Sequence, residues 1–128
     1  VTMSFLRGRL GAERERMVAL VQRAYDEAVS MCAPGVAARA IALRVDAVFA
    51  SEGYVMPHGL GHGVGLDAHE EPSIRSREDC ADVLEPGHVV TIEPGLYHPE
   101  LGGVRLENDV LIGDAGAQVI TASRIVRL

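Results

Sequence analysis

The chain has 128 residues, of which 12 are basic and 18 are acidic, so its formal net charge is −6. An acidic chain with scattered basic residues lacks the positive surface that nucleic acid requires, so we expect no nucleic-acid partner. No apolar run approaches the roughly 20 residues that span a bilayer, and residues 1–10 lack the apolar core of a secretory signal. We therefore expect no membrane association and a cytoplasmic protein that forms a single domain over residues 1–128.

Two amphipathic helices are predicted in the first half of the chain. Residues 12–31 carry apolar side chains at helical spacing, and charged residues fill the other positions. The segment 32–36 then breaks the pattern with proline and glycine. A second apolar stripe begins at Ile41 and continues towards Gly53, which provides a helix stop.

The second half of the chain is punctuated by glycine and proline and contains short alternating or β-branched runs. These runs predict four strands, over residues 58–66, 88–97, 102–112 and 117–123. Helices in one part of a chain and strands in the other are typical of an α+β fold, with the helices covering one face of an antiparallel sheet.

The segment HGLGHGVGLDAHEEP, residues 58–72, holds three of the five histidines. His58 and His62 have the i, i+4 spacing of a helical zinc motif, but the glycines between and after them disfavour a helix. As a strand, the segment directs both imidazoles to one face with Leu60 and Leu66, and it leaves the glycine face bare for the close approach of another backbone. The match of GVGLDA to a dinucleotide-binding loop fails because no helix follows it.

Two carboxylates stand in otherwise apolar strands, Glu93 in VVTIEPGLY and Glu107 in GGVRLENDVLI. Each one alone is compatible with an exposed strand whose carboxylate lies in water. A buried carboxylate, in contrast, is costly unless it is paired or binds a cation. Together with His62, the two carboxylates predict an oxygen-rich site that suits Mn²⁺, Co²⁺, Fe²⁺ or Zn²⁺.

These three motifs, in this order, resemble those of the pita-bread metallopeptidases, the family of methionine aminopeptidase, Xaa-Pro dipeptidase (prolidase) and aminopeptidase P. The resemblance covers essentially the whole chain and implies the C-terminal half of a pita-bread fold, with two helices covering a curved antiparallel sheet. It implies that His62, Glu93 and Glu107 are metal ligands, with Glu107 bridging two ions. The implied cofactor is a divalent metal, dinuclear in the complete site and one of Mn, Co, Fe or Zn; no other cofactor-binding residue is implied.

The resemblance also implies catalytic residues and a peptide substrate. His69 matches the histidine that steadies the substrate, Glu93 is expected to act as general base, and His58 is expected to donate a hydrogen bond to the oxyanion. Arg105 is expected to orient a substrate carboxylate or to lock neighbouring acids. His58 and Arg105 are usual in proline-directed members and unusual in methionine aminopeptidases, which implies an Xaa-Pro dipeptidase or an aminopeptidase P-like enzyme.

The first residues depart from the family pattern. VTMSFL resembles a strand that carries an aspartate ligand, so the resemblance places two aspartate ligands ahead of Val1. We therefore expect a chain that lacks the N-terminal half of the catalytic domain, binds metal weakly and hydrolyses Xaa-Pro peptides poorly. An unpaired sheet edge favours a homo-oligomer, most simply a dimer. Two alternatives stay open: a catalytically silent peptide- or protein-binding module, and a creatinase-like or ectoine-hydrolase-like enzyme that acts on a non-peptide amide.

Overall fold

The computed structural model describes residues 1–128 and contains two helices and nine strands. Helix α1 spans Ala12–Met31 and helix α2 spans Ala38–Ala50, which confirms both predicted helices. Each helix buries most of the apolar stripe that predicted it. Neither N-cap residue makes a side-chain hydrogen bond to its helix, so the packing of the apolar faces, rather than capping, stabilises the helices.

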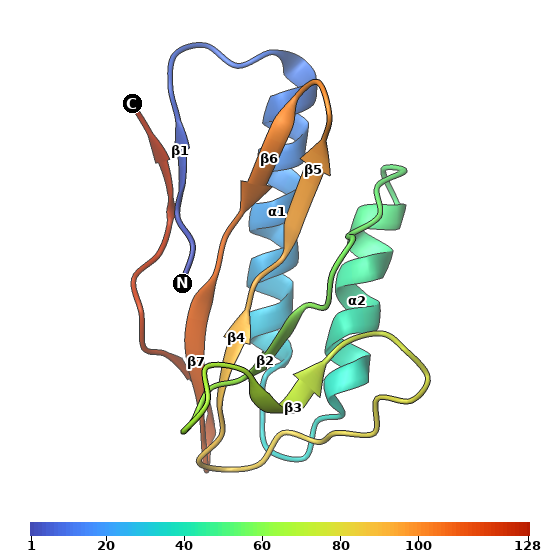
Figure 1. Cartoon of the computed structure of the whole chain (residues 1–128), viewed down its shortest axis with the longest axis vertical. Coiled ribbons are helices and arrows are strands. Elements are labelled where there is room, and N and C mark those ends of the chain that lie inside the picture. The colour runs from blue at the N-terminus through green and yellow to red at the C-terminus, as the bar shows by residue number, and fades with distance from the viewer.

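The two helices cover one face of a five-stranded antiparallel sheet (Figure 1). The order of its strands is β3-β2-β4-β7-β8. Their bounds are Glu70–Ile74 (β3), Gly61–Gly63 (β2), Val89–Ile92 (β4), Asn108–Gly113 (β7) and Gly116–Val119 (β8). The predicted α+β arrangement, with helices covering an antiparallel sheet, is therefore confirmed.

Two smaller sheets complete the fold. Strand β5 (Gly95–His98) pairs antiparallel with β6 (Gly102–Arg105), and β1 (Ser4–Leu6) pairs parallel with β9 (Ile125–Arg127). The β1–β9 pair brings the first and last segments of the chain side by side (Figure 1). Neither helix has the combination of length and apolar character that crossing a membrane requires.

Strands β4 and β5, followed by β6 and β7, form one long hairpin. Residues that pair across it are equidistant from residue 100. Ile92 pairs with Asn108 where β4 meets β7, and Gly95 pairs with Arg105 where β5 meets β6. The two parts therefore share one register, although a gap separates them.

The gap in the hairpin arises at Pro94. The N–H of Leu106 donates to the carbonyl of Pro94 at 3.3 Å, but proline has no N–H to return the bond, so the ladder is interrupted. The predicted strands over residues 88–97 and 102–112 are consequently each divided in two.

The prediction of a single strand over residues 58–66 is wrong. Only Gly61–Gly63 forms a strand, and Leu60 is fully buried whereas Leu66 is fully exposed, so these two leucines do not share a face. A three-residue strand fixes the alternation of side chains only within its own length, and the backbone leaves the sheet on both sides of it. Strand β3, which is absent from the predicted strands, pairs with β2.

The strand predicted over residues 117–123 is also shorter than expected, because β8 ends at Val119. Beyond it, the hydroxyl of Thr121 and the N–H of Ser123 donate to the side chain of Asn108 at 2.9 and 2.7 Å. These side-chain bonds replace a strand ladder and turn the chain towards β9.

Candidate metal site

Two carboxylates face each other at the interruption of the hairpin. Glu93 and Glu107 are equidistant from residue 100, so the shared register of the flanking pairs places them directly opposite each other. Their backbone groups bond to other segments: the N–H of Glu93 donates to the carbonyl of Leu60 at 2.9 Å, and Glu107 exchanges two hydrogen bonds with Thr2. Opposed residues whose backbone groups point outward in this way have closely spaced side chains.

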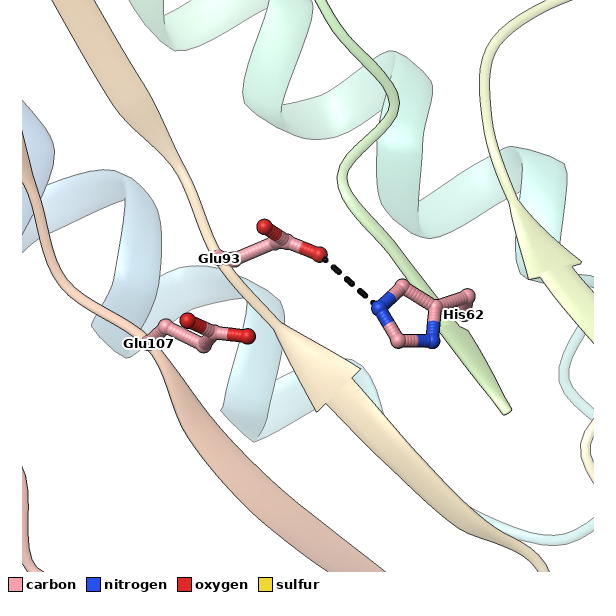
Figure 2. A group of neighbouring side chains, drawn as sticks. All are labelled: His62, Glu93 and Glu107. Carbon is pink, nitrogen blue, oxygen red and sulfur yellow. Dashed lines mark ion pairs between the residues drawn. The ribbon is translucent and has the colours of Figure 1, made fainter. Parts of the chain in front are cut away.

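His62 completes the cluster from the neighbouring strand β2. The register of β2 with β4 places His62 beside Thr91, whose Oγ1 accepts the His62 backbone N–H at 3.0 Å. One donor atom from each of His62, Glu93 and Glu107 lies within 4.8 Å of the other two (Figure 2). The exposed fractions of these side chains are 21, 14 and 11%. The fold thus brings together the three residues that were predicted to bind metal.

The spacing and chemistry of these donors fit a divalent ion. His62 Nε2 lies 3.4 Å from Glu93 Oε1, and two ligands that are each about 2.1 Å from an ion in tetrahedral geometry are about 3.4 Å apart. A set of one imidazole nitrogen and carboxylate oxygens suits Mn²⁺, Co²⁺, Fe²⁺ or Zn²⁺. Cys32 and Cys80 are free, buried thiols that lie outside the cluster, so they offer it no thiolate.

A backbone hydrogen bond determines which nitrogen of His62 is free. Nδ1 lies 2.8 Å from the carbonyl oxygen of Gly63, and a carbonyl only accepts, so Nδ1 carries the hydrogen in the neutral ring. The lone pair is then on Nε2, the nitrogen that faces Glu93. Metal-binding histidines usually have this arrangement, in which the second nitrogen donates to a carbonyl or carboxylate.

Each carboxylate accepts a hydrogen bond from a threonine hydroxyl. Thr91 Oγ1 donates to Glu93 Oε1 at 3.1 Å, within the same segment of chain. Thr2 Oγ1 donates to Glu107 Oε2 at 2.5 Å, from the other end of the sequence. Each carboxylate of the cluster thus has a hydroxyl group as hydrogen-bond donor.

Several positive or hydrogen-donating groups act on Glu107. Burial acts to raise the pKa of Glu107, whereas the Thr2 hydroxyl and the charge of Arg105 act to lower it, and this pKa lies below its ordinary value. The carboxylate is therefore charged at neutral pH, which is the form that binds a cation.

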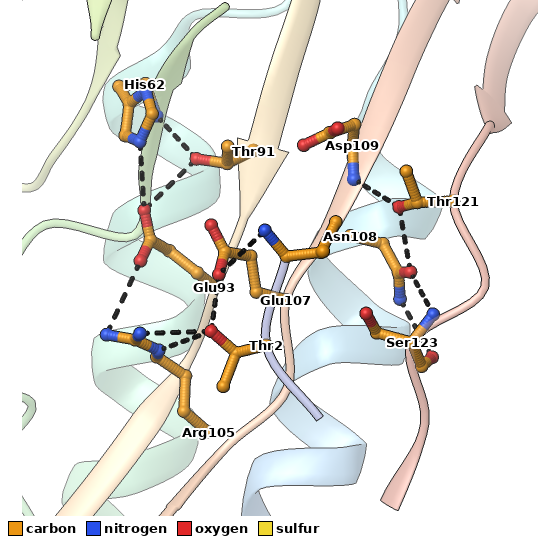
Figure 3. Close-up of polar contacts among 11 residues, drawn as sticks. Thr2, His62, Thr91, Glu93, Arg105, Glu107, Asn108, Asp109, Thr121 and Ser123 are labelled. Atoms are coloured by element: carbon orange, nitrogen blue, oxygen red, sulfur yellow. Dashed lines mark hydrogen bonds and ion pairs between the residues drawn. The ribbon is translucent and has the colours of Figure 1, made fainter. Parts of the chain in front are cut away.

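Arg105 contacts both halves of this network (Figure 3). Its Nε and Nη2 atoms donate to Thr2 Oγ1 at 3.1 and 3.0 Å, and its Nη1 lies 3.9 Å from Glu93 Oε2. Of the two roles predicted for Arg105, the locking of neighbouring acids matches these contacts. Its role towards a substrate carboxylate stays a prediction.

The two other predicted catalytic histidines lie around the cluster. The ring of His69 is exposed, and its centre lies 4.2 Å from that of His62. His58 is not one of the cluster residues: its Nδ1 lies 2.8 Å from the Gly59 carbonyl, and its Nε2 lies 3.0 Å from the hydroxyl of Tyr97. Both nitrogens of His58 therefore have partners, and its predicted role as a donor to the oxyanion requires a change of partner.

The glycines of the histidine segment allow close contacts between backbones. A Cβ atom on Gly61 would lie 1.9 Å from the carbonyl oxygen of Thr91, and one on Gly63 would lie 2.2 Å from that of Glu71. The predicted close approach of another backbone is therefore confirmed at these two of the four glycines. It also explains how His62 sits within reach of β4.

Sequence reasoning missed three residues of the site: Thr2, Thr91 and Tyr97. Thr91 precedes Glu93 by two residues, so the alternation of a strand gives a signal for it. Thr2 and Tyr97 act on residues that are 105 and 39 positions away, and no local pattern indicates such contacts.

The fold and the cluster together define the C-terminal half of the pita-bread fold. The model of metallopeptidase family M24 matches residues 1–114, and the chain belongs to this family. Members of the family generally use divalent metals.

Relatives in this family are named as dipeptidases, and some of them as Xaa-Pro dipeptidases. The chain is 37% identical over 123 residues to the Xaa-Pro dipeptidase of Pyrococcus furiosus, covering 94% of this chain and 35% of that protein. It is also 37% identical over 123 residues to the putative dipeptidase YkvY of Bacillus subtilis, covering 94% of this chain and 33% of that protein. The chain thus spans about a third of the length of these relatives.

Solved structures agree with this assignment. The prolidase from Pyrococcus horikoshii OT3 has a TM-score of 0.87 at 35% identity, over 92% of this chain and 34% of that one. The X-Pro aminopeptidase from Thermotoga maritima has a TM-score of 0.84 at 28% identity, over 94% of this chain and 35% of that one. A methionine aminopeptidase from Rickettsia prowazekii, at 18% identity and a TM-score of 0.76, shares the fold alone.

Proposed function

We propose that this chain carries the metal site of a metallopeptidase that hydrolyses the peptide bond before proline, as an Xaa-Pro dipeptidase or an aminopeptidase P-like enzyme does. Its similarity to a prolidase and to Xaa-Pro dipeptidases supports this substrate class. Because the chain spans about a third of the length of those relatives, the activity and the substrate are both part of the proposal.

The observation that carries the proposal is the pair of opposed carboxylates. Like charges directly opposite each other on neighbouring strands destabilise a sheet, and Glu93 and Glu107 are both largely withdrawn from water. Arg105 approaches Glu93 only to 3.9 Å and reaches Glu107 through Thr2. A divalent ion held by the two carboxylates and His62 offsets their repulsion and gives the buried acids a function.

When bound, the ion would polarise the scissile carbonyl and activate the attacking water. The side chains around it would then supply proton transfer and orientation. Glu93 serves as general base, since its carboxylate lies at the cluster and the Thr91 hydroxyl fixes its orientation. His69, exposed next to His62, donates a hydrogen bond to the substrate, and Arg105 keeps Glu93 in place.

The cluster provides three side chains that would hold one ion. A second ion would need further ligands beyond His62, Glu93 and Glu107. We therefore propose that this chain alone binds divalent metal weakly and turns over Xaa-Pro peptides slowly.

We also propose that the chain self-associates, most simply as a homodimer. Strands β3 and β8 form the edges of the main sheet, and Phe5 and Leu66 are large apolar residues that are mostly exposed. Sedimentation at several concentrations tests this point, because a stable monomer at high concentration contradicts it.

Calorimetric titration with Co²⁺ tests the metal site. We expect weak binding of one ion per chain, loss of that binding in His62→Ala, and no change in His98→Ala, since His98 lies in the hairpin outside the cluster. Absence of Co²⁺ binding by the unaltered chain, or equal binding by His62→Ala, overturns the proposed site.

The substrate class is tested on the Co²⁺-loaded chain with Met-Pro and Met-Ala. We expect Met-Pro to bind more tightly and to be hydrolysed slowly, and both effects to disappear with EDTA. Equal affinities and equal hydrolysis rates for Met-Pro and Met-Ala overturn the preference for proline. Tight binding of Met-Pro that is indifferent to metal, without hydrolysis, favours the silent binding module instead.

A further inference from the structure

Thr2 connects the start of the chain to the metal cluster. Its backbone forms an antiparallel bridge with Glu107, through Thr2 N–H to Glu107 carbonyl at 3.3 Å and Glu107 N–H to Thr2 carbonyl at 3.1 Å. This bridge lies where the long hairpin is interrupted. There the backbone N–H and carbonyl of Glu107 point away from Glu93, and they pair with the backbone of Thr2. The side chain of Thr2 is thereby placed next to the Glu107 carboxylate (Figure 3).

The contacts of the Thr2 hydroxyl determine the direction of its hydrogen bond. A threonine hydroxyl has one hydrogen and two lone pairs, whereas an arginine side chain only donates. Arg105 donates to Thr2 Oγ1 from both Nε and Nη2, at 3.1 and 3.0 Å. Both lone pairs are then in use, so the single hydrogen of Thr2 points to Glu107 Oε2 at 2.5 Å.

We propose that Thr2 is a positioning residue for the metal ligand Glu107, and that it transmits to this carboxylate the orientation imposed by Arg105. The inference rests on the proposed metal-dependent function. With the hydrogen of Thr2 fixed on Oε2, the Glu107 carboxylate has one preferred rotation, and the ligand geometry exists before the ion arrives. Groups that orient the ligands of a metal in this way typically contribute about 10- to 100-fold to its affinity.

The neighbouring hydroxyl on β1 provides a matched control. Ser4 lies two residues after Thr2, and its Oγ bonds to the backbone N–H and carbonyl of Arg105 at 3.1 and 2.8 Å. It therefore also attaches β1 to β6, but it has no bond to a ligand carboxylate. Removing either hydroxyl weakens the attachment of β1, whereas only the loss of the Thr2 hydroxyl releases Glu107.

The test compares Co²⁺ affinity and the visible absorption spectrum of bound Co²⁺ in four chains: unaltered, Thr2→Val, Thr2→Ser and Ser4→Ala. Thr2→Val keeps the shape of the side chain without the hydroxyl. We expect it to weaken Co²⁺ binding by about 10- to 100-fold and to change the spectrum. Thr2→Ser restores both, and Ser4→Ala leaves both unchanged. Thermal unfolding of the metal-free chains serves as the structural comparison, with similar losses expected for Thr2→Val and Ser4→Ala.

The possible failures are distinguishable. If the unaltered chain does not bind Co²⁺, or if His62→Ala binds it equally well, the proposed metal site itself is overturned. If the unaltered chain binds Co²⁺ through His62 and Thr2→Val retains its affinity and spectrum, only the inference about Thr2 is overturned. A parallel loss of affinity in Ser4→Ala also overturns it, because the effect then comes from the attachment of β1.

Discussion

The side-chain amide of Asn108 donates a hydrogen bond of 3.0 Å to the hydroxyl of Tyr25, and so ties β7 to helix α1 immediately after Glu107. Asn108 is only 2% exposed. Its Nδ2 also donates to the Ser123 carbonyl at 3.1 Å, while its Oδ1 accepts from Thr121 Oγ1 and the Ser123 N–H. All four hydrogen-bonding capacities of the amide are therefore satisfied inside the protein.

Replacement of Asn108 by leucine is expected to lower the free energy of unfolding by about 3 kcal/mol, because several buried polar groups lose their partners at once. Urea denaturation measures the change. The matched control is Gln118→Leu on β8, where the amide is exposed and an effect within about 0.5 kcal/mol is expected. Similar losses of unfolding free energy in both variants would show that the buried hydrogen bonds of Asn108 do not stabilise the fold.

The local features of this fold could be predicted from the sequence. The two helices follow from apolar spacing, and the close backbone contacts at Gly61 and Gly63 follow from a strand that presents glycine on one face. Each of these features depends on the residues within one short segment. Glu93 and Glu107 are different, because each one alone was also compatible with an exposed strand and only their combination with His62 predicted a shared site.

The register of the hairpin could also have been predicted from the sequence, although it was not. A hairpin whose strands are equidistant from residue 100 necessarily opposes Glu93 and Glu107, and Pro94 signals the missing ladder bond. The contacts of Thr2 and Tyr25 are different, because they depend on how β1 and α1 pack against the sheet. Those contacts follow from tertiary structure, which periodicity does not encode.

Gly61→Ala is expected to destabilise the chain by about 3 kcal/mol, since overpacking against a backbone forces the neighbouring strand to move. The added Cβ would lie 1.9 Å from the Thr91 carbonyl oxygen, and this carbonyl belongs to strand β4. Gly59→Ala is the control within the same motif, because its Cβ would meet its nearest neighbour at an ordinary 3.5 Å. Urea denaturation of both variants checks the prediction. Equal free energies of unfolding for Gly61→Ala and Gly59→Ala would contradict it.

The thiol of Cys32 is expected to resist alkylation in the folded chain. Burial raises the pKa of Cys32 to about 11, and its Sγ donates to the carbonyl of Ala28 at 3.3 Å. At pH 8 only about one such thiol in a thousand is ionised, and the thiolate is the reactive form. Iodoacetamide labelling of a Cys80→Ser variant isolates this thiol. Slow labelling that accelerates in urea is expected, and rapid labelling of the folded chain contradicts the buried position.

The two helices are joined by an ion pair whose contribution to stability depends on pH. Glu27 of α1 accepts a hydrogen bond from Arg23 Nε at 2.8 Å and another from Arg44 Nε of α2 at 2.5 Å. These two bonds, that of Arg23 first, lower the pKa of Glu27 below its ordinary 4.5. Since the lowered pKa belongs to the folded state, the stabilisation is complete above the unfolded value of 4.5 and is lost as the pH falls through the folded value.

Glu27→Gln should therefore lower the midpoint of thermal unfolding slightly at pH 7, and this difference from the unaltered chain should disappear at pH values below the lowered pKa. The pair lies at the surface, so 1 M NaCl should reduce the difference at pH 7 as well. An Arg44→Gln background provides the control, because Glu27 then keeps only its partner within α1 and the substitution should matter less. A difference that persists unchanged at pH 3 and in high salt would mean that Glu27 stabilises the helix pair by packing and not by charge.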